Sequence, residues 1–205
     1  MTRQTPAAMR IKYGVDRVVA AVAIAVLGPV WLLIAVLVRL SSPGPIIHRR
    51  RVLGSDGAPF DAFKFRTMVA DADRRLWQDP ALRDEFVRQM KVRDDPRLTR
   101  LGRWLRRTSL DELPQLFNVL RGEMSLVGPR MIAPEEAEKY GAFLARRLAV
   151  RPGITGLWQV SGRQELSYER RIELDMQYLD NWSLWLDLVI LVRTIPAVLS
   201  MRGAH

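Results

Sequence analysis

The sequence predicts a small α/β or α-rich domain that carries one membrane-embedded segment at its N-terminal end. Two observations lead to this fold class. Residues 18–38 contain no charge and, as one helix, would reach roughly 31 Å, about the thickness of a hydrocarbon core. The rest of the chain alternates short strand and helix patterns in no clear β-α-β order. We therefore divide the 205 residues into a membrane-embedded segment, 1–40, and a cytoplasmic domain, 41–205, with amphipathic helices at the membrane interface.

The membrane segment contains Gly28-Pro29 at its middle, where Pro29 has no N–H to donate to the carbonyl of Ala25. Basic residues flank both of its ends, and positive charge marks the cytoplasmic side of a membrane. These residues are Arg3, Arg10, Lys12 and Arg17 before the segment and Arg39, Arg49, Arg50 and Arg51 after it. The pattern favours a re-entrant helix–break–helix. A spanning anchor stays the alternative, because spanning helices also tolerate proline.

The composition limits the chemistry that the chain can perform. A formal net charge of +10 indicates an anionic partner such as membrane lipid, nucleic acid or a phosphorylated substrate. The chain has no cysteine, and its two histidines are His48 and His205. This excludes cysteine nucleophiles, disulfides and Cys/His zinc sites, and it disfavours a Ser-His-Asp triad. The common glycine-rich nucleotide-binding motifs are absent as well. A bound metal would be a hard ion held by oxygen, such as Mg²⁺.

After the membrane segment, residues 46–53 and 58–65 are typical of a short β-hairpin around the turn 54–57. Residues 71–93 carry charge at helical spacing and indicate a solvated helix. Residues 97–107 contain arginines but no acid, with apolar residues on the other side, as in a helix that lies on an anionic membrane. A helix packed on the core with a solvated basic face fits equally well. Nucleic acid is disfavoured as a partner, because base-stacking aromatics do not interleave with this charge.

Two stretches rich in glycine and proline, 125–134 and 150–162, predict structured loops. Arg130, Arg151 and Arg163 lie on or beside them. Taken singly, each of these arginines is more often an exposed ion-pair partner than a ligand. Together, they could form a phosphate-binding surface, since guanidinium groups match phosphate geometry.

The C-terminal stretch, 184–199, is apolar but carries Asp187, Arg193 and Pro196. These residues exclude a second membrane span. The stretch is instead expected to form an interfacial or core-packed helix.

The stretch 108–117 places Asp111 and Glu112 side by side at the predicted start of a helix, directly after a run of arginines. A helix N-terminus attracts both carboxylates and phosphates, so Asp111 is a candidate nucleophile or metal ligand facing a phosphorylated substrate. The alternative is that these residues only cap the helix. Ser109 and Glu112 have the spacing of a capping box, and Asp111 could itself be the N-cap.

Four stretches together resemble the bacterial sugar transferase family, the monotopic phosphoglycosyl transferases. The C-terminal one most resembles the exopolysaccharide-initiating members of this family. The similarity extends from about Lys12 to Leu199. The stretches are SSPGPIIHRRRVLGSDGAPFDAFKFRTM (41–68), LRRTSLDELPQLFNVLRGEMSLVGPR (105–130), VRPGITGLWQVSGR (150–163) and NWSLWLDLVILVRT (181–194).

The resemblance implies that a nucleotide diphosphate sugar, usually a UDP-sugar, gives its sugar phosphate to polyprenol phosphate and releases UMP. This would be the first membrane step of polysaccharide or glycoconjugate synthesis. It implies that Asp111 is the nucleophile and that Glu112 supports Mg²⁺, with both carboxylates as candidate ligands. It also links Arg106 to the lipid phosphate. Arg130 matches the central arginine of a Pro-Arg-Pro element whose second proline is Met131 here. Gly28-Pro29 stands where the family has Ser-Pro.

Further expectations follow from the resemblance and the arginine-bearing loops. Arg151 and Arg163 join Arg106 and Arg130 as candidate substrate-binding residues. The expected partners are a nucleotide diphosphate sugar, polyprenol phosphate and inner-membrane lipid, without nucleic acid and with an oligomer left open. The expected location is the cytoplasmic face of the bacterial inner membrane.

Two other classes of function are compatible with parts of the sequence. One is a non-catalytic, membrane-anchored adaptor that binds anionic lipid or nucleic acid through its arginines. The other is a glycoside hydrolase, which is disfavoured because adjacent carboxylates cannot easily flank a sugar at the separation that such enzymes need.

Overall fold

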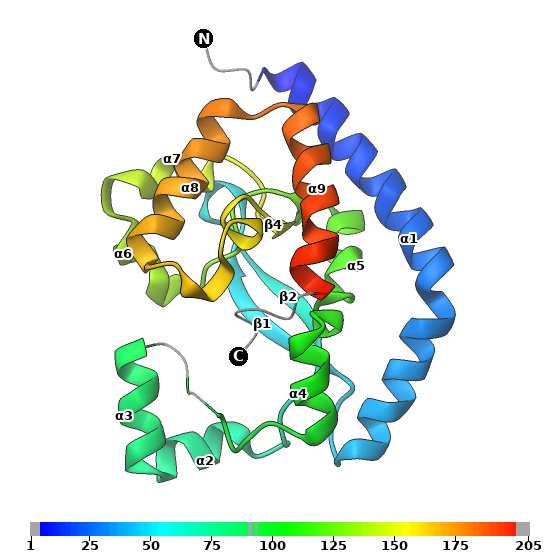
Figure 1. Cartoon of the computed structure of the whole chain (residues 1–205), viewed down its shortest axis with the longest axis vertical. Coiled ribbons are helices and arrows are strands. Elements are labelled where there is room, and N and C mark those ends of the chain that lie inside the picture. The colour runs from blue at the N-terminus through cyan, green and yellow to red at the C-terminus, as the bar shows by residue number, and fades with distance from the viewer. Residues whose placement is uncertain (1–4, 90–91, 93, 200–205) are drawn as a thin grey trace.

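The computed structural model describes residues 5–89, 92 and 94–199 (Figure 1). Arg3 and His205, both named above, lie outside the described residues. A long N-terminal helix, α1 (Pro6–Ser41), runs along one side of a small and mostly helical body. The body contains two small sheets, and short 3₁₀ turns connect many of its helices. The structure confirms the predicted N-terminal apolar helix and the small, mostly helical α/β domain.

The body begins with a hairpin of strands β1 (Ile47–Leu53) and β2 (Pro59–Phe65). Eight helices follow in the described part of the chain, and four of them are very short. They are α2 (Ala72–Gln78), α3 (Pro80–Gln89), α4 (Arg100–Arg107), α5 (Gln115–Arg121), α6 (Ala137–Tyr140), α7 (Leu144–Leu148), α8 (Tyr168–Asn181) and α9 (Leu184–Leu199). A second sheet pairs β3 (Ser125–Val127) with β4 (Gly153–Thr155).

Helix α1 is continuous through Gly28 and Pro29, so the predicted interruption at this point is wrong. The Thr5 side chain caps its first turn by accepting a hydrogen bond from the N–H of Ala8 (3.2 Å). Pro29 removes one hydrogen bond, to the carbonyl of Ala25, but its fixed φ is compatible with a helix. The helix therefore bends around the body instead of breaking (Figure 1).

The inner face of α1 packs on the body along most of its length, while the outer face is apolar and exposed. The first half contacts the main core through Ala20, Ala23 and Ile24, and the second half packs Ile34 and Val38 in a cluster with α4 and the hairpin. The exposed apolar residues include Val18, Val22, Val26, Leu32, Leu33, Val36 and Leu40. Of the helices that the structure describes, α1 alone is long and apolar enough to cross a membrane.

A buried polar cluster ties the N-terminal part of α1 to the C-terminal helices. The ammonium group of Lys12 lies 2.5 Å from Asp187 of α9 and 3.6 Å from Asp16, one turn further along α1. Asp16 accepts a hydrogen bond from the Ser125 hydroxyl (2.6 Å), and Asp187 accepts one from Tyr178 of α8 (2.7 Å). Lys12, expected among the flanking charges, is thus a buried ion-pair residue. Asp187 is tolerated in an apolar helix because these partners compensate its charge.

The hairpin forms where the sequence predicts it, with Ile47 opposite Phe65 and Leu53 opposite Pro59. The parallel pair β3–β4 replaces what the sequence predicts as loops. Each strand is only three residues long, which is too short to show a periodic pattern. The close approach of the β3 and β4 segments requires glycine, because a Cβ on Gly153 would lie 2.2 Å from the backbone nitrogen of Gly128.

Two helical predictions change in detail. The single helix expected over 71–93 is divided into α2 and α3 at Asp79-Pro80, because a residue before proline avoids the helical conformation. Helix α4 is amphipathic as expected. It packs on the core through Leu105 and leaves Trp104 exposed beside its arginines.

Helix α9 is core-packed on one face and exposed on the other. Its Ile190 is fully buried in the main core. Its outer face leaves large apolar side chains exposed, namely Leu184, Trp185, Leu188, Val192 and Ile195. Core packing and an interfacial position, the two options left open by the sequence, are therefore both compatible with α9.

Candidate active site

Asp111 and Glu112 lie on a 3₁₀ turn, Leu110–Glu112, that connects α4 to α5. The expectation that they begin a helix is wrong, since α5 begins three residues later, at Gln115. The capping interpretation fails as well. Pro114 occupies the N-cap position of α5, and the Ser109 side chain makes no cap hydrogen bond. The Glu112 side chain turns toward two basic residues, Lys64 and Arg130, so neither carboxylate serves as a helix cap.

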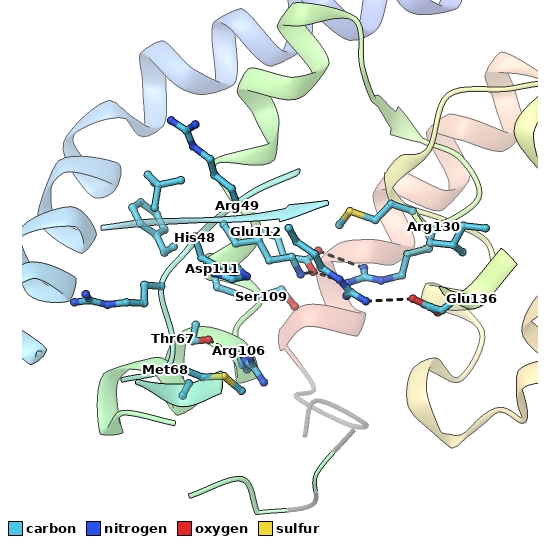
Figure 2. Close-up of a pocket in the computed structure, with 18 of the residues that line it drawn as sticks. His48, Arg49, Thr67, Met68, Arg106, Ser109, Asp111, Glu112, Arg130 and Glu136 are labelled. Atoms are coloured by element: carbon cyan, nitrogen blue, oxygen red, sulfur yellow. Dashed lines mark hydrogen bonds and ion pairs between the residues drawn. The ribbon is translucent and has the colours of Figure 1, made fainter. Parts of the chain in front are cut away.

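The two carboxylates line a cavity of about 800 Å³ (Figure 2). One wall is the hairpin with the residues that follow it, and the opposite wall is formed by the loops that carry Arg130 and Arg163. The lining is strongly basic, and an anionic substrate is therefore favoured. Its basic residues are His48, Arg49, Arg50, Lys64, Arg66, Arg106, Arg130, Lys139, Arg163 and Arg171.

Glu112 is held between two cations. Its Oε1 atom lies 2.6 Å from the ammonium group of Lys64 and 2.6 Å from Nη2 of Arg130, and its Oε2 accepts a longer bond from Nη1 of Arg130 (3.4 Å). Burial alone would raise the pKa of Glu112. The charges and hydrogen bonds of Arg130 and Lys64 outweigh burial and hold this pKa well below its usual range. Glu112 is therefore an ionised carboxylate whose Oε1 is engaged by two cations and whose Oε2 makes only the longer bond.

Asp111 is the opposite case. Its side chain is buried, with 6% of the residue exposed. Among the residues that the structure describes, none donates a hydrogen bond to its carboxylate. Burial raises the pKa of Asp111 to about 6, with Lys64 and Arg106 acting against the rise and the adjacent Glu112 adding to it. The result is an unpartnered carboxylate that faces a cationic cavity and that titrates close to neutral pH.

Arg106 approaches the cavity from the last turn of α4. Its Nε donates to the hydroxyl of Thr67 (3.0 Å), which leaves the two terminal nitrogens of the guanidinium group for a ligand. The approach of α4 to Thr67 depends on Gly102, where a Cβ atom would lie 1.9 Å from the Thr67 carbonyl oxygen. Gly102 and Thr67 together therefore position Arg106.

Arg130 and Arg163 reach the cavity from two loops, as the sequence predicts. The carbonyl of Arg130 accepts a hydrogen bond from the buried Arg147 (2.5 Å), which supports this loop from behind. Arg163 has a left-handed backbone (φ 54°), as has Ser109 (φ 55°), and its Nη2 donates to the Ser109 hydroxyl (3.2 Å). The Nη1 of Arg163 is buried without a partner in the described part of the chain. Met131, in place of the second proline, is buried.

Arg151 lies outside this cavity, so the structure does not group it with the other three arginines. Its guanidinium group stacks on the ring of Tyr13 of α1, 4.0 Å from the ring centre. The backbone N–H of Arg151 donates to the hydroxyl of the same tyrosine (3.3 Å). The sequence places Arg151 on a glycine-rich loop beside Arg163, but the loop turns this side chain toward α1.

The sequence does not identify three residues of the site, namely Lys64, Thr67 and Arg147. It identifies Ser109 only as a possible cap, whereas in the structure the Ser109 hydroxyl holds Arg163. A signal exists for Lys64. Phe60 and Ala62 are buried at alternate positions of β2, so Lys64 continues an inward-facing set in which a charge is unexpected. Arg147 has no comparable signal, because its partner is a backbone carbonyl that is distant in sequence.

Whole-sequence comparison shows which family the chain belongs to. The chain belongs to the bacterial sugar transferase family, whose family model matches residues 7–201. It is 46% identical over 198 residues to the exopolysaccharide production protein ExoY of Sinorhizobium fredii, covering 95% of this chain and 88% of that protein.

Longer relatives match as well. The undecaprenyl-phosphate galactose phosphotransferase of Salmonella typhimurium is 46% identical over 166 residues, which are 79% of this chain and 35% of that protein. The UDP-glucose:undecaprenyl-phosphate glucose-1-phosphate transferase of Xanthomonas campestris pv. campestris is 42% identical over 198 residues, or 93% of this chain and 39% of that protein.

Proposed function

We propose that this chain transfers a sugar 1-phosphate from a UDP-sugar to undecaprenyl phosphate and releases UMP. The observation that carries the proposal is the unpartnered Asp111 carboxylate in a cationic cavity, beside a Glu112 that is already neutralised by Arg130 and Lys64. Relatives named for galactose and for glucose match this chain about equally well, so the sugar stays open.

The reaction proceeds in two displacements at one phosphorus atom. A carboxylate oxygen of Asp111 attacks the phosphorus that bears the sugar, and the bond from that phosphorus to the UMP oxygen breaks. UMP leaves, and an aspartyl phosphate that carries the sugar is formed. An oxygen of undecaprenyl phosphate then attacks the same phosphorus and expels the Asp111 carboxylate. The product is the undecaprenyl diphosphate sugar.

Arginines supply the electrostatic part of this mechanism. Both substrates are anionic, and their direct reaction would meet charge repulsion. Arg106 has two guanidinium nitrogens, and Arg163 has one, without a protein partner in the described residues, and these can donate to phosphate oxygens. Arg130 neutralises Glu112 and so prevents a second free negative charge next to Asp111. The nucleophile therefore faces a cavity whose charge is mainly positive.

The residues fit a magnesium ion that binds together with substrate. No group of three or more His, Cys, Asp or Glu side chains that could hold a metal occurs within the described ranges. Mg²⁺ commonly uses one or two carboxylates and completes its shell with water and phosphate oxygens. Asp111 offers unoccupied oxygens, and Glu112 offers mainly the weakly bonded Oε2. A Mg²⁺ ion held here would neutralise charge on the diphosphate.

We place the site at the cytoplasmic face of the inner membrane. Both halves of α1 pack on the same body, at Ala20 in the first half and Val38 in the second, while the outer face is apolar. A helix held along its length by a soluble body would lie in one leaflet, with both ends on the same side. The exposed apolar face of α9 would add a second contact with lipid.

UMP release tests the proposal directly. The purified chain, incubated with a UDP-sugar, Mg²⁺ and no lipid acceptor, should release about one UMP per active enzyme and gain the mass of a sugar phosphate on the peptide that contains Asp111. Asp111→Asn should abolish both signals while the protein stays folded. EDTA should stop turnover, and added Mg²⁺ should restore it.

Either of two results would contradict the mechanism. Normal turnover of the Asp111→Asn enzyme would exclude the covalent intermediate. Full activity in EDTA would exclude the metal.

A further inference from the structure

A second cationic site lies on the outside of the molecule, where α1 passes the C-terminal end of α5. Arg17 of α1 and Arg151 of the β3–β4 region both lie against Gly122, which ends α5 with a left-handed backbone (φ 80°). A Cβ atom at position 122 would lie 2.3 Å from Nη2 of Arg17 and 3.4 Å from Nη1 of Arg151. Because both nitrogens are so close to one point, the two guanidinium groups are within reach of a single phosphate group.

These two arginines have no acidic partner among the described residues. In the part of the chain that the structure describes, neither guanidinium group forms an ion pair or donates a hydrogen bond. The nearby acids are engaged elsewhere, since Asp16 binds Lys12 and Ser125, and Glu123 accepts a hydrogen bond from Asn118 (2.7 Å). Two like charges held together without an anion repel each other. Burial lowers the pKa of Arg151 most, Tyr13 and Asp16 act against this, and the charge of Arg17 adds to the lowering, in agreement with this repulsion.

The position of Arg151 is built into the fold rather than left to a mobile side chain. Its guanidinium group is stacked on Tyr13, and the Tyr13 hydroxyl holds the backbone N–H of the same residue. Stacking on an aromatic ring fixes the plane of a guanidinium group and leaves its edge nitrogens free for an anion. Gly122 provides the space in which the two arginines meet, because any side chain there would displace Arg17.

The surroundings identify the kind of anion. Arg17 directly precedes the uncharged stretch 18–38, and the neighbouring outer face of α1 exposes Val15, Val18 and Val19. If this face lies in lipid, the two guanidinium groups are at the level of the headgroups. A soluble phosphate compound would leave the adjoining apolar surface exposed to water, whereas the acyl chains of a phospholipid would cover it.

We propose that Arg17 and Arg151 bind the headgroup phosphate of an anionic phospholipid of the bilayer, at a site separate from the cavity that contains Asp111. This inference rests on the proposed placement of α1 at the membrane but does not depend on the transfer reaction. The site holds the first half of α1 at a fixed depth in the membrane, because Arg17 of α1 and Arg151 of the body bind the same headgroup.

Native mass spectrometry of the full chain in neutral detergent tests the site, with phosphatidylglycerol and phosphatidylcholine as the added lipids. The wild-type protein should retain phosphatidylglycerol in preference to phosphatidylcholine. The double variant Arg17→Gln/Arg151→Gln should retain about ten-fold less phosphatidylglycerol, since it loses the charge-assisted hydrogen bonds. The variant Arg17→Lys/Arg151→Lys should lie between the two, because lysine keeps the charge but not the bidentate geometry.

Arg10→Gln is the matched control, because Arg10 is an exposed arginine on the same helix, and it should retain lipid like the wild type. Phosphatidylglycerol should also raise the temperature of thermal unfolding of the wild-type protein, but not that of the double glutamine variant. A cooperative unfolding transition in detergent alone shows that this variant is folded.

Three results would overturn the site while leaving the membrane placement of α1 intact. They are unchanged lipid retention in the double glutamine variant, an equal loss in Arg10→Gln, and equal thermal protection of the wild type by inorganic phosphate without lipid. Recovery of the wild-type protein in the soluble fraction of lysed cells would instead overturn the membrane placement, and the lipid site with it.

Discussion

At the scale of single residues, Asp111 and Glu112 differ in charge state because their neighbours differ. Glu112 is bound by two cations, and Asp111 by none among the described residues. The sequence shows two adjacent carboxylates, but it cannot show which of them is neutralised. That distinction depends on Lys64 and Arg130, which come from a strand and a loop on opposite sides of the pair in sequence.

The raised pKa of Asp111 predicts a pH profile. The carboxylate must be ionised to attack phosphorus, so kcat/KM should rise with pH through about 6 and then level off. Lys64→Met removes a positive charge that acts against the rise in this pKa, and it should move the midpoint to higher pH. Steady-state UMP release at a series of pH values measures both midpoints. An unchanged midpoint in Lys64→Met would show that another group controls the profile.

The contact between Ser109 and Arg163 predicts that a substitution at Ser109 lowers activity without lowering stability. Ser109→Gly keeps the left-handed backbone without strain but removes the hydroxyl that holds Arg163. Its kcat/KM should fall about ten-fold, the effect of losing one hydrogen bond to a charged group, while its melting temperature should not fall.

Ser109→Ala is the matched variant. It should lose the same activity but keep about the stability of the wild type, because alanine and serine bear the same strain in this conformation; Ser109→Gly should therefore be the more stable of the pair by about 1 kcal/mol. Kinetics and thermal unfolding of the pair provide the test. Normal activity in both variants would remove Ser109 from the site.

At the scale of secondary structure, local patterns predict local elements well. The hairpin follows from two short strand-like segments around a glycine-containing turn, and α1 follows from an uncharged stretch of sufficient length. The β3–β4 pair and the turn at Asp111 could not be predicted. Their conformations are set by close contacts with distant segments, such as Gly153 against Gly128 and Ser109 against Arg163.

Gly102 shows how such a contact positions a functional residue. Gly102→Ala would place a methyl group at the Thr67 carbonyl, so α4 should shift and carry Arg106 away from the cavity. We expect a loss of about 1–3 kcal/mol of stability together with a lower kcat/KM. The control is Gly14→Ala on α1, where a Cβ would meet nothing within 4 Å and where alanine favours the helix. Chemical denaturation measures the free energy of unfolding of both variants. A Gly102→Ala protein as stable as the wild type would contradict the proposed contact.

At the scale of the whole molecule, α1 is part of the folded body as well as a membrane segment. Lys12 is buried between Asp16 and Asp187, so Lys12→Met should leave two buried carboxylates without their cation. Removing one partner of a buried ion pair costs about 3–5 kcal/mol, and thermal unfolding in detergent should show a loss of this size. A loss below about 1 kcal/mol, as for an exposed ion pair, would mean that water reaches the cluster.

The orientation of α1 in the membrane can be tested because the chain has no cysteine. Single cysteines at Ala7 and at Ser55 should both be protected from a membrane-impermeant reagent added to intact cells. Both should react after lysis. Labelling of Ala7→Cys in intact cells, with Ser55→Cys protected, would establish a spanning helix and exclude a re-entrant one.

The ion pair between α1 and α9 also bears on how the protein is made. Lys12 leaves the ribosome early, but Asp187 follows 175 positions later, a delay of roughly 9 to 35 seconds at ordinary rates of synthesis. During this time Lys12 has only Asp16, one turn away, as a partner. The nascent helix therefore reaches the bilayer with Lys12 already paired inside the helix. The pair between Lys12 and Asp187, which fixes α1 on the body, can form only when α9 has been synthesised.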